Sequence, residues 1–151
     1  MRSAALLLAA ISGAATAGDD LKYLAEAIYF EARSEPLACQ IIVAQNILNR
    51  VDQERFPNTI KEVVHQSTKT KNGKLVCQFS YYCDGKSDLM LNTRAEIKSY
   101  QVASMVLLDQ APDLSEGSDH YYAHNIVTPK WKSAMTDTFV CGNHTFGKLK
   151  W

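Results

Sequence analysis

The first regular pattern in the chain begins near residue 20, where apolar side chains recur at the spacing of an α-helix. Asp19 or Asp20 can cap the start of this segment, and Pro36 cannot continue a helix. The pattern therefore predicts an amphipathic helix that ends before Pro36. Its apolar stripe consists of Leu21, Leu24, Ala25, Ile28 and Ala32.

Three further helices are predicted from periodicity and capping residues. The second spans about Leu37 to Gln53, with an apolar stripe that includes Ile41, Ala44, Leu48 and Val51. Residues 56–59 form a turn, and Thr59 with Glu62 is a capping box for a short helix that ends near Gln66. Thr93 and Glu96 form another capping box, which opens a helix that we expect to end at Pro112.

The remaining segments are irregular or β-like. Residues 67–91 are polar and rich in lysine, which predicts a long surface loop without regular structure, pinned by its own cysteines. After a loop over 113–119, short β-like pieces follow at 120–123, 138–140 and 144–146. The predicted fold class is mainly α (α+β), with a small irregular β element near the C-terminus.

Length and charge limit the function classes. A chain of 151 residues that is 46% hydrophobic suits one domain with a sizeable core. Lys+Arg and Asp+Glu both number 16, so no net positive charge attracts nucleic acid. A nucleic-acid partner is therefore disfavoured.

The first residues have the features of a signal peptide. Arg2 precedes the apolar run 4–11, and Ala15-Thr16-Ala17 is the small-x-small pattern of a cleavage site. A membrane anchor is the alternative, but the run is shorter than the roughly 20 apolar residues that span a bilayer. We expect residues 1–17 to be a signal peptide, residues 18–151 to be a single catalytic domain, and the protein to be periplasmic or secreted.

Export changes the meaning of the four cysteines. An even number of cysteines in an oxidising compartment favours two disulfides over free thiols, and the sequence allows three pairings. We prefer Cys77–Cys83 with Cys39–Cys141, because the second bridge would cross-link most of the chain. A zinc site is disfavoured, since no Cys-x-x-Cys or close Cys/His pair is present.

Three glutamates on the first helix are not equivalent. At about 100° per residue, Glu26 falls with Arg33 on the face opposite the apolar stripe, where we expect a solvated or ion-paired side chain. Glu35 lies almost inside the stripe. Glu31 lies at its border beside aromatic residues and close to the helix end, where burial can keep a carboxyl group protonated at neutral pH. Glu31 is therefore the candidate general acid, although a surface glutamate is the simpler alternative.

Aromatic residues gather in two loops. Phe79, Tyr81 and Tyr82 lie between cysteines, and a second group follows in the tail: Tyr121, Tyr122 and Trp131. Aromatic faces stack on sugar rings, so we hypothesise that both groups line one cleft. For each side chain, packing in the core is the alternative.

Several motifs together resemble the cell-wall hydrolase family typified by spore cortex-lytic enzymes. They are Phe30-Glu31-Ala32-Arg33-Ser34-Glu35-Pro36, Ile47-Leu48-Asn49-Arg50-Val51, Phe56-Pro57-Asn58-Thr59-Ile60, Cys77-Gln78-Phe79-Ser80, His120-Tyr121-Tyr122, Pro129-Lys130-Trp131 and Gly142-Asn143-His144-Thr145-Phe146. The chain departs from the family at Ser34, where glycine is frequent, and its cysteine loop resembles only the versions from Gram-negative bacteria and their phages.

The resemblance implies a lysozyme-like helical domain that cleaves peptidoglycan in the manner of a lytic transglycosylase, with Glu31 as the catalytic glutamate. The expected substrate-binding residues are Glu35, Phe79, Ser80, His120, Tyr121, Tyr122, Trp131 and His144. The expected partner is peptidoglycan, without a metal, a cofactor or stable membrane insertion, and the expected state is a monomer.

The chemistry expected of Glu31 is proton donation followed by proton recovery. It would protonate the glycosidic oxygen between N-acetylmuramic acid and N-acetylglucosamine and then accept the proton of the muramic 6-hydroxyl, which gives a 1,6-anhydro product. In the two-carboxylate alternative, Glu35 or Asp84 would activate water instead.

Two other classes of function remain open at this point. One is a metal-dependent hydrolase that uses Asp119, His120 and His124, although the extended character of this segment does not suit helical ligand spacing. The other is a secreted glycan-binding module without catalysis, in which Glu31 could be replaced without consequence.

Overall fold

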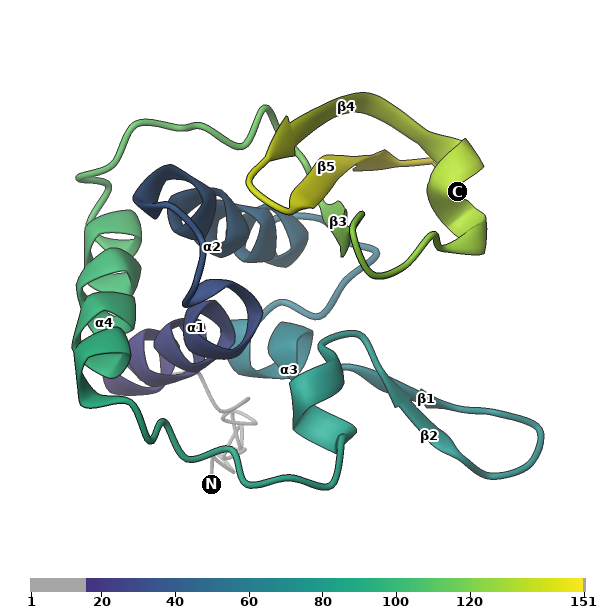
Figure 1. Ribbon diagram of the computed structural model, residues 1–151, viewed down its shortest axis with the longest axis horizontal. Helices are drawn as coiled ribbons and strands as arrows, with labels where there is room; N and C mark the ends of the chain where they lie inside the picture. Colours follow the sequence, from purple (N-terminus) through teal and green to yellow (C-terminus); the bar gives the residue numbers. More distant parts are fainter. Residues whose placement is uncertain (1–15, 151) are drawn as a thin grey trace, which may run out of the picture.

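The computed structural model describes residues 16–150. Helices α1 (Ala17–Ala32), α2 (Leu37–Val51), α3 (Ile60–Val64) and α4 (Thr93–Leu107) form one part of the molecule, and a small sheet lies at the other side (Figure 1). Helix α1 contacts the other three helices. Its fully buried side chains Leu24 and Ile28 belong to one core together with Val43, Ile47 and Val102.

The strands form two separate antiparallel sheets. Strands β1 (Ser67–Lys69) and β2 (Leu75–Cys77) make a hairpin that projects from the body of the protein (Figure 1). Strands β3 (His120–Ala123), β4 (Met135–Cys141) and β5 (His144–Leu149) form a sheet in the order β3-β5-β4. Short 3₁₀ helices, η1 (Ser80–Cys83) and η2 (Lys130–Ala134), lie between these elements. The predicted class, mainly helical with a small β element, is confirmed.

The structure corrects three sequence-based boundaries. The segment 67–91 contains the β1–β2 hairpin and η1, so it is not a loop without regular structure. The cap of α4 is Asn92, whose side chain accepts a hydrogen bond from the Ala95 N–H, whereas Thr93 is already helical. Helix α4 also ends at Leu107, well before Pro112, because the chain turns at Asp109, whose φ is 53°. The Thr59–Glu62 capping box of α3 forms as predicted.

The disulfides Cys39–Cys141 and Cys77–Cys83 form, which is the pairing preferred from the sequence. The first joins the first turn of α2 to the end of β4 across 102 residues of sequence. The second closes a short loop around η1. The first bridge therefore ties the helical part to the small sheet, and the second constrains η1.

The predicted leader lies outside the described residues except for its last two. Thr16 caps α1 by accepting a hydrogen bond from the Asp19 N–H, and Ala17 is the first helical residue. Over residues 16–150, the helices are too short or too polar to cross a bilayer.

Candidate active site

A cleft of about 490 Å³ opens where the C-terminal end of α1 faces η1 and the small sheet. Its walls come from segments that are far apart in the sequence: the end of α1, the η1 segment with the loop after it, the end of β3, and the β4–β5 turn. The cleft is lined by Phe30, Glu31, Arg33, Glu35, Ser80, Tyr81, Asp84, Lys86, Ser87, Asp88, Ala123, Asn125, Ile126, Asn143 and His144.

Glu31 lies in the last turn of α1, with its side chain half-buried at the cleft wall. Its Oε2 accepts a hydrogen bond of 3.0 Å from the hydroxyl of Tyr121. Burial raises the pKa of Glu31 to about 7, although the Tyr121 hydrogen bond and the positive charge of Arg50 act in the opposite direction. A carboxyl group with this pKa can both donate and accept a proton near neutral pH.

Tyr121 reaches Glu31 because of the pleat of β3. Side chains alternate along the strand, so Tyr121 and Ala123 face α1 and the cleft, whereas His120 and Tyr122 point to the other face of the sheet. The Tyr121 ring packs against Phe146, with ring centres 5.3 Å apart. Burial raises the pKa of Tyr121 well above its usual range, so its hydroxyl stays protonated and acts as a donor.

Glu35 lies in the turn between α1 and α2 and is buried against the β4–β5 turn. Its Oε2 accepts a 3.3 Å hydrogen bond from the Asn143 N–H, and its Oε1 lies 3.5 Å from Nδ1 of His144. Gly142 makes this approach possible, because a Cβ at that position would lie 2.0 Å from Oε2 of Glu35. Burial lowers the pKa of His144, although the neighbouring Glu35 acts in the opposite direction. Glu35 and His144 thus form one corner of the cleft.

Glu26 is buried, which corrects its assignment to the solvated face of the first helix. It is 8% exposed, and its Oε1 accepts a 3.2 Å hydrogen bond from the Tyr81 hydroxyl. Burial raises the pKa of Glu26. The reason is that η1 covers this side of α1, and His65 of the segment after α3 approaches the same carboxyl oxygen at 3.7 Å.

The structure brings only part of the predicted substrate-binding set to the cleft. Glu35, Ser80 and His144 line it, and Tyr121 lies behind Glu31. Phe79 is buried in the core at 2% exposure. The other three lie together on the far face of β3, where Trp131 contacts both rings: His120 at 5.5 Å and Tyr122 at 5.9 Å between centres. The two aromatic groups therefore do not line one cleft.

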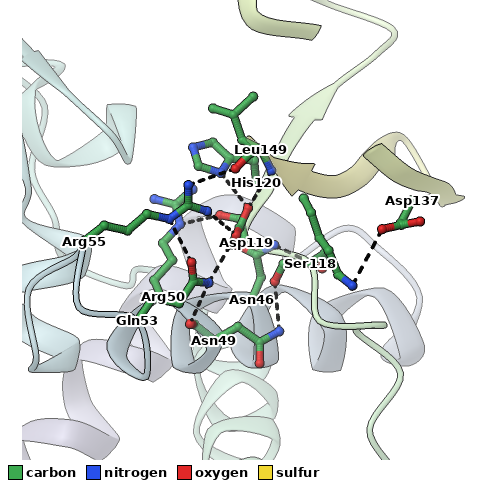
Figure 2. A network of polar contacts seen from close by, with 11 residues as sticks. Asn46, Asn49, Arg50, Gln53, Arg55, Ser118, Asp119, His120, Asp137 and Leu149 are labelled. Carbon is green, nitrogen blue, oxygen red and sulfur yellow. Dashed lines mark hydrogen bonds and ion pairs between the residues drawn. The ribbon is translucent and has the colours of Figure 1, made fainter. Parts of the chain in front are cut away.

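His120 belongs to a polar network centred on Asp119 (Figure 2). The carboxylate of Asp119 is held by the side chains of Arg55 and Gln53 at Oδ2, and by the His120 ring and the Leu149 N–H at Oδ1. Burial acts to raise the pKa of Asp119, but these hydrogen bonds outweigh it and hold the pKa well below its usual range. The network ties the loop after α2 to β3 and the end of β5.

The histidines proposed for a metal site serve other contacts. Nδ1 of His120 pairs with Asp119 at 2.9 Å, and Nδ1 of His124 lies 3.1 Å from the Thr145 hydroxyl. Across residues 16–150, no cluster of three or more His, Cys, Asp or Glu side chains is placed to hold a metal ion. The metal-dependent alternative therefore has no ligand cluster in the part of the chain that the structure describes.

Sequence reasoning missed Arg50 as part of this site. Arg50 follows Val43 and Ile47 at helical spacing, so its position on the buried face of α2 was visible in the pattern. The polar residues of the irregular loops carried no such signal, because no periodicity places Lys86, Asp88 or Asn125 in space.

Comparisons with known proteins place the chain in one family of cell-wall enzymes. The profile of the Cell Wall Hydrolase family matches residues 34–147, a range that begins three residues after Glu31. A spore cortex-lytic enzyme of Bacillus cereus is 29% identical over 132 residues, which are 86% of this chain and 44% of that protein. A spore cortex-lytic enzyme of Oceanobacillus iheyensis is 42% identical over 132 residues, which are 42% of that protein. The chain thus spans less than half the length of these curated relatives.

Solved catalytic domains match the chain over nearly their whole length. The catalytic domain of the Bacillus cereus SleB protein aligns with a TM-score of 0.63 at 27% identity, covering 89% of this chain and 93% of that one. The catalytic domain of the germination-specific lytic transglycosylase SleB from Bacillus anthracis gives the same TM-score and identity, covering 91% and 98%.

Proposed function

Because this chain belongs to the Cell Wall Hydrolase family, we propose that it is a peptidoglycan-cleaving enzyme with Glu31 as its general acid and base. The observation that carries the proposal is the state of Glu31, a half-buried carboxyl group with a pKa of about 7 at the wall of the cleft between α1, η1 and the small sheet. The proposal is also supported by the names of the relatives, which are cortex-lytic enzymes and a lytic transglycosylase.

In the first step, protonated Glu31 donates its proton to the glycosidic oxygen between N-acetylmuramic acid and N-acetylglucosamine. The bond from the muramic C1 to that oxygen breaks, positive charge develops on the muramic ring, and the leaving sugar departs with a free hydroxyl. The carboxylate left on Glu31 still accepts the hydrogen bond from Tyr121, which becomes stronger when the acceptor is charged.

In the second step, the Glu31 carboxylate takes the proton of the muramic 6-hydroxyl while that oxygen bonds to C1. The product is a 1,6-anhydro ring, Glu31 is protonated again, and no water is consumed. A single carboxyl group is sufficient for this route, because the nucleophile is part of the substrate and is already close to C1.

The competing route is hydrolysis, in which Glu35 or Asp84 activates a water molecule. Both line the cleft with Glu31. The position of Glu35 favours the transglycosylase route, because Oε2 of Glu35 is engaged by the Asn143 N–H and Oε1 faces His144. The role proposed for Glu35, together with His144 and Ser80, is substrate binding at the rim of the cleft.

The deciding experiment compares wild-type protein with Glu31→Gln and, as a control, Glu54→Gln, which removes a carboxyl group from an exposed glutamate outside the cleft. We expect Glu31→Gln to slow the digestion of purified peptidoglycan by about 10²–10⁴-fold, and Glu54→Gln to leave it unchanged. Full digestion by folded Glu31→Gln would contradict the proposal.

Mass spectrometry of the released muropeptides separates the two routes. The 1,6-anhydro product is lighter by one water than the reducing-end product of hydrolysis. Binding to peptidoglycan without any released product, in both wild type and Glu31→Gln, would instead support a glycan-binding module without catalysis.

The location and organisation that fit this function are also proposals. A signal peptide over residues 1–17 would direct a single catalytic domain, residues 18–151, to the periplasm or the exterior, where its substrate lies. The disulfides Cys39–Cys141 and Cys77–Cys83 suit such an oxidising compartment. We propose that the domain acts as a monomer on peptidoglycan strands.

A further inference from the structure

Arg50 is a buried cation with an unused hydrogen-bond donor. It lies in the last turn of α2 and is 4% exposed. Its Nε donates a 2.6 Å hydrogen bond to the backbone carbonyl of Asp119, and over residues 16–150 its Nη1 has no hydrogen-bond partner. A buried charged group with an unsatisfied donor is costly for stability, which calls for a functional reason.

The guanidinium of Arg50 is held between two aromatic rings. It lies 5.4 Å from the ring centre of Phe56 and 5.3 Å from that of Phe79. Phe79 also neighbours Tyr121, with ring centres 6.4 Å apart. Arg50 and Tyr121 therefore pack on the same ring, and Arg50 also holds the backbone of Asp119, which leads directly into β3 (Figure 2).

The carboxylate of Asp119 favours the charged form of Arg50, as Glu31 does, but the hydrogen bonds of that carboxylate come from other groups. That carboxylate is engaged by Gln53, Arg55, His120 and the Leu149 N–H, whereas the Nε of Arg50 donates to the backbone carbonyl of Asp119. Burial lowers the pKa of Arg50, but a guanidinium keeps its proton in proteins. The positive charge therefore acts on the interior that it shares with Tyr121 and Glu31.

We propose that Arg50 is a positioning residue of the Glu31 site, which holds Tyr121 in place through Phe79 and Asp119 and whose charge stabilises the Glu31 carboxylate formed when the proton leaves. This inference rests on the proposed function of Glu31. Arg50 is electrostatically coupled to Tyr121, Asp119 and Glu31, and of these Glu31 is the group that gains a negative charge when its proton is donated. Arg50 does not line the cleft, so it acts through other residues and not on the substrate.

Other titratable groups also face Glu31. Tyr121 approaches from β3, and Tyr81 from η1 is electrostatically coupled to Glu31. Across the cleft lie further charged or titratable side chains: Arg33, Glu35, Asp84, Lys86, Asp88 and His144. These groups remain in every variant below, so differences between variants report Arg50.

The test measures the titration of Glu31 in folded protein by carbon-13 NMR of the side-chain carboxyl group, together with digestion rates across pH. The neutral variants are Arg50→Met and Arg50→Gln, and Arg50→Lys restores a positive charge. The control is Arg55→Met, which removes a second arginine from the Asp119 network without approaching Glu31.

We expect the neutral variants to move the Glu31 titration, and with it the alkaline limb of the activity profile, to higher pH by about one pH unit. The maximal turnover should fall about 10-fold or more while the KM for peptidoglycan stays unchanged, because less stabilisation remains for the carboxylate. Arg50→Lys should restore most of the titration, and Arg55→Met should titrate like wild type.

Three outcomes would overturn the inference. The first is a wild-type Glu31 titration in a folded neutral variant. The second is an equal shift in Arg55→Met. The third is loss of folding in both neutral variants under conditions where Arg55→Met stays folded, which would make Arg50 a residue of the fold. The proposed function fails separately, if Glu31→Gln digests peptidoglycan at the wild-type rate.

Discussion

The hydroxyl of Tyr121 donates a 3.0 Å hydrogen bond to Oε2 of Glu31, joining strand β3 to the last turn of α1 across 90 residues of sequence. The hydroxyl of Tyr121 can donate a hydrogen bond whether Glu31 is protonated or ionised. Burial keeps the tyrosine protonated as a donor and brings the glutamate to a pKa of about 7. This contact links the sheet to the proton chemistry proposed for the cleft.

Removing the hydroxyl with Tyr121→Phe is expected to raise the pKa of Glu31 further, because the hydrogen bond favours the carboxylate. Activity at the optimum should fall by about 10-fold to 100-fold, and the alkaline limb of the pH profile should move to higher pH. Digestion rates between pH 5 and 9 measure both effects. Tyr122→Phe, on the opposite face of β3, is the matched control and should keep the wild-type profile.

The raised pKa of Glu31 also predicts how stability depends on pH. The pKa is about 7 in the folded protein and 4.5 as the reference, so between these values the folded state holds the proton more tightly than the unfolded state. The contribution of Glu31 to stability is therefore greatest below pH 4.5 and is lost as pH rises through 7. Glu31→Gln does not titrate and escapes this loss.

We therefore expect Glu31→Gln to gain stability relative to wild type by about 2–3 kcal/mol on going from pH 4 to pH 8. Urea denaturation at pH 4, 6 and 8 measures the difference, and Glu54→Gln, which removes an exposed carboxyl group outside the cleft, serves as the control. A constant difference for Glu31→Gln would mean that its carboxyl group titrates normally.

Gly142→Ala tests the contact between the β4–β5 turn and Glu35. Gly142 has a φ of 56°, and an added Cβ would lie 2.0 Å from Oε2 of Glu35. The matched control is Gly73→Ala, where φ is 78° but no atom lies within 4 Å of the added Cβ. Thermal denaturation should show a loss of about 1–2 kcal/mol for Gly73→Ala and a clearly larger loss for Gly142→Ala.

A double variant separates crowding from backbone strain at Gly142. In a Glu35→Ala background the added Cβ no longer meets a carboxylate, so the extra cost of Gly142→Ala should largely disappear. If Gly142→Ala costs the same with and without Glu35, the close approach of the two residues does not limit the turn.

The two disulfides should differ in their contribution to stability. In the loop-entropy account, the Cys39–Cys141 bridge, with a sequence separation of 102, stabilises the fold by about 4–5 kcal/mol, and the Cys77–Cys83 bridge, with a separation of 6, by about 2 kcal/mol. Denaturant titrations of the paired Cys→Ser variants measure both values. If Cys77→Ser/Cys83→Ser lost more stability than Cys39→Ser/Cys141→Ser, the loop-entropy account would be contradicted, and η1 would be held mainly by its own bridge.

Local signals were sufficient to predict most of the helical fold. The stripes of α1 and α2 depend on the helical repeat, and the Thr59 cap depends on a side chain that bonds three residues ahead, so neither needs knowledge of distant segments. Glu31 could be selected for the same reason, because its angle on α1 placed it at the edge of the apolar stripe.

Features that depend on contacts with distant segments, such as the burial of Glu26, were predicted wrongly from the sequence. Glu26 was assigned to solvent because a helical wheel assumes one wet face, but α1 is surrounded by α2, α3 and α4, and Tyr81 covers its remaining side. The β1–β2 hairpin was missed because both strands are exposed and lack an apolar alternation. Its turn nevertheless carried a readable signal in Asn72-Gly73, and Gly73 has a φ of 78°.

The orientation of the β3 side chains, which decides which of them faces α1, could not be predicted from the sequence. The sequence offered His120, Tyr121 and Tyr122 as neighbours with the same expected role, and only the pairing of β3 with β5 determines which of them faces α1. Tyr121 reaches Glu31, whereas its two neighbours pack with Trp131 on the other face.

Because side chains alternate along β3, the site is sensitive to the register in which this strand pairs with β5. Shifting β3 by one residue along β5 would bring His120 or Tyr122 to the position that faces α1, in place of Tyr121. A change of length within the four residues of β3 would therefore alter the contact with Glu31, whereas the β1–β2 hairpin projects away from the body of the protein (Figure 1).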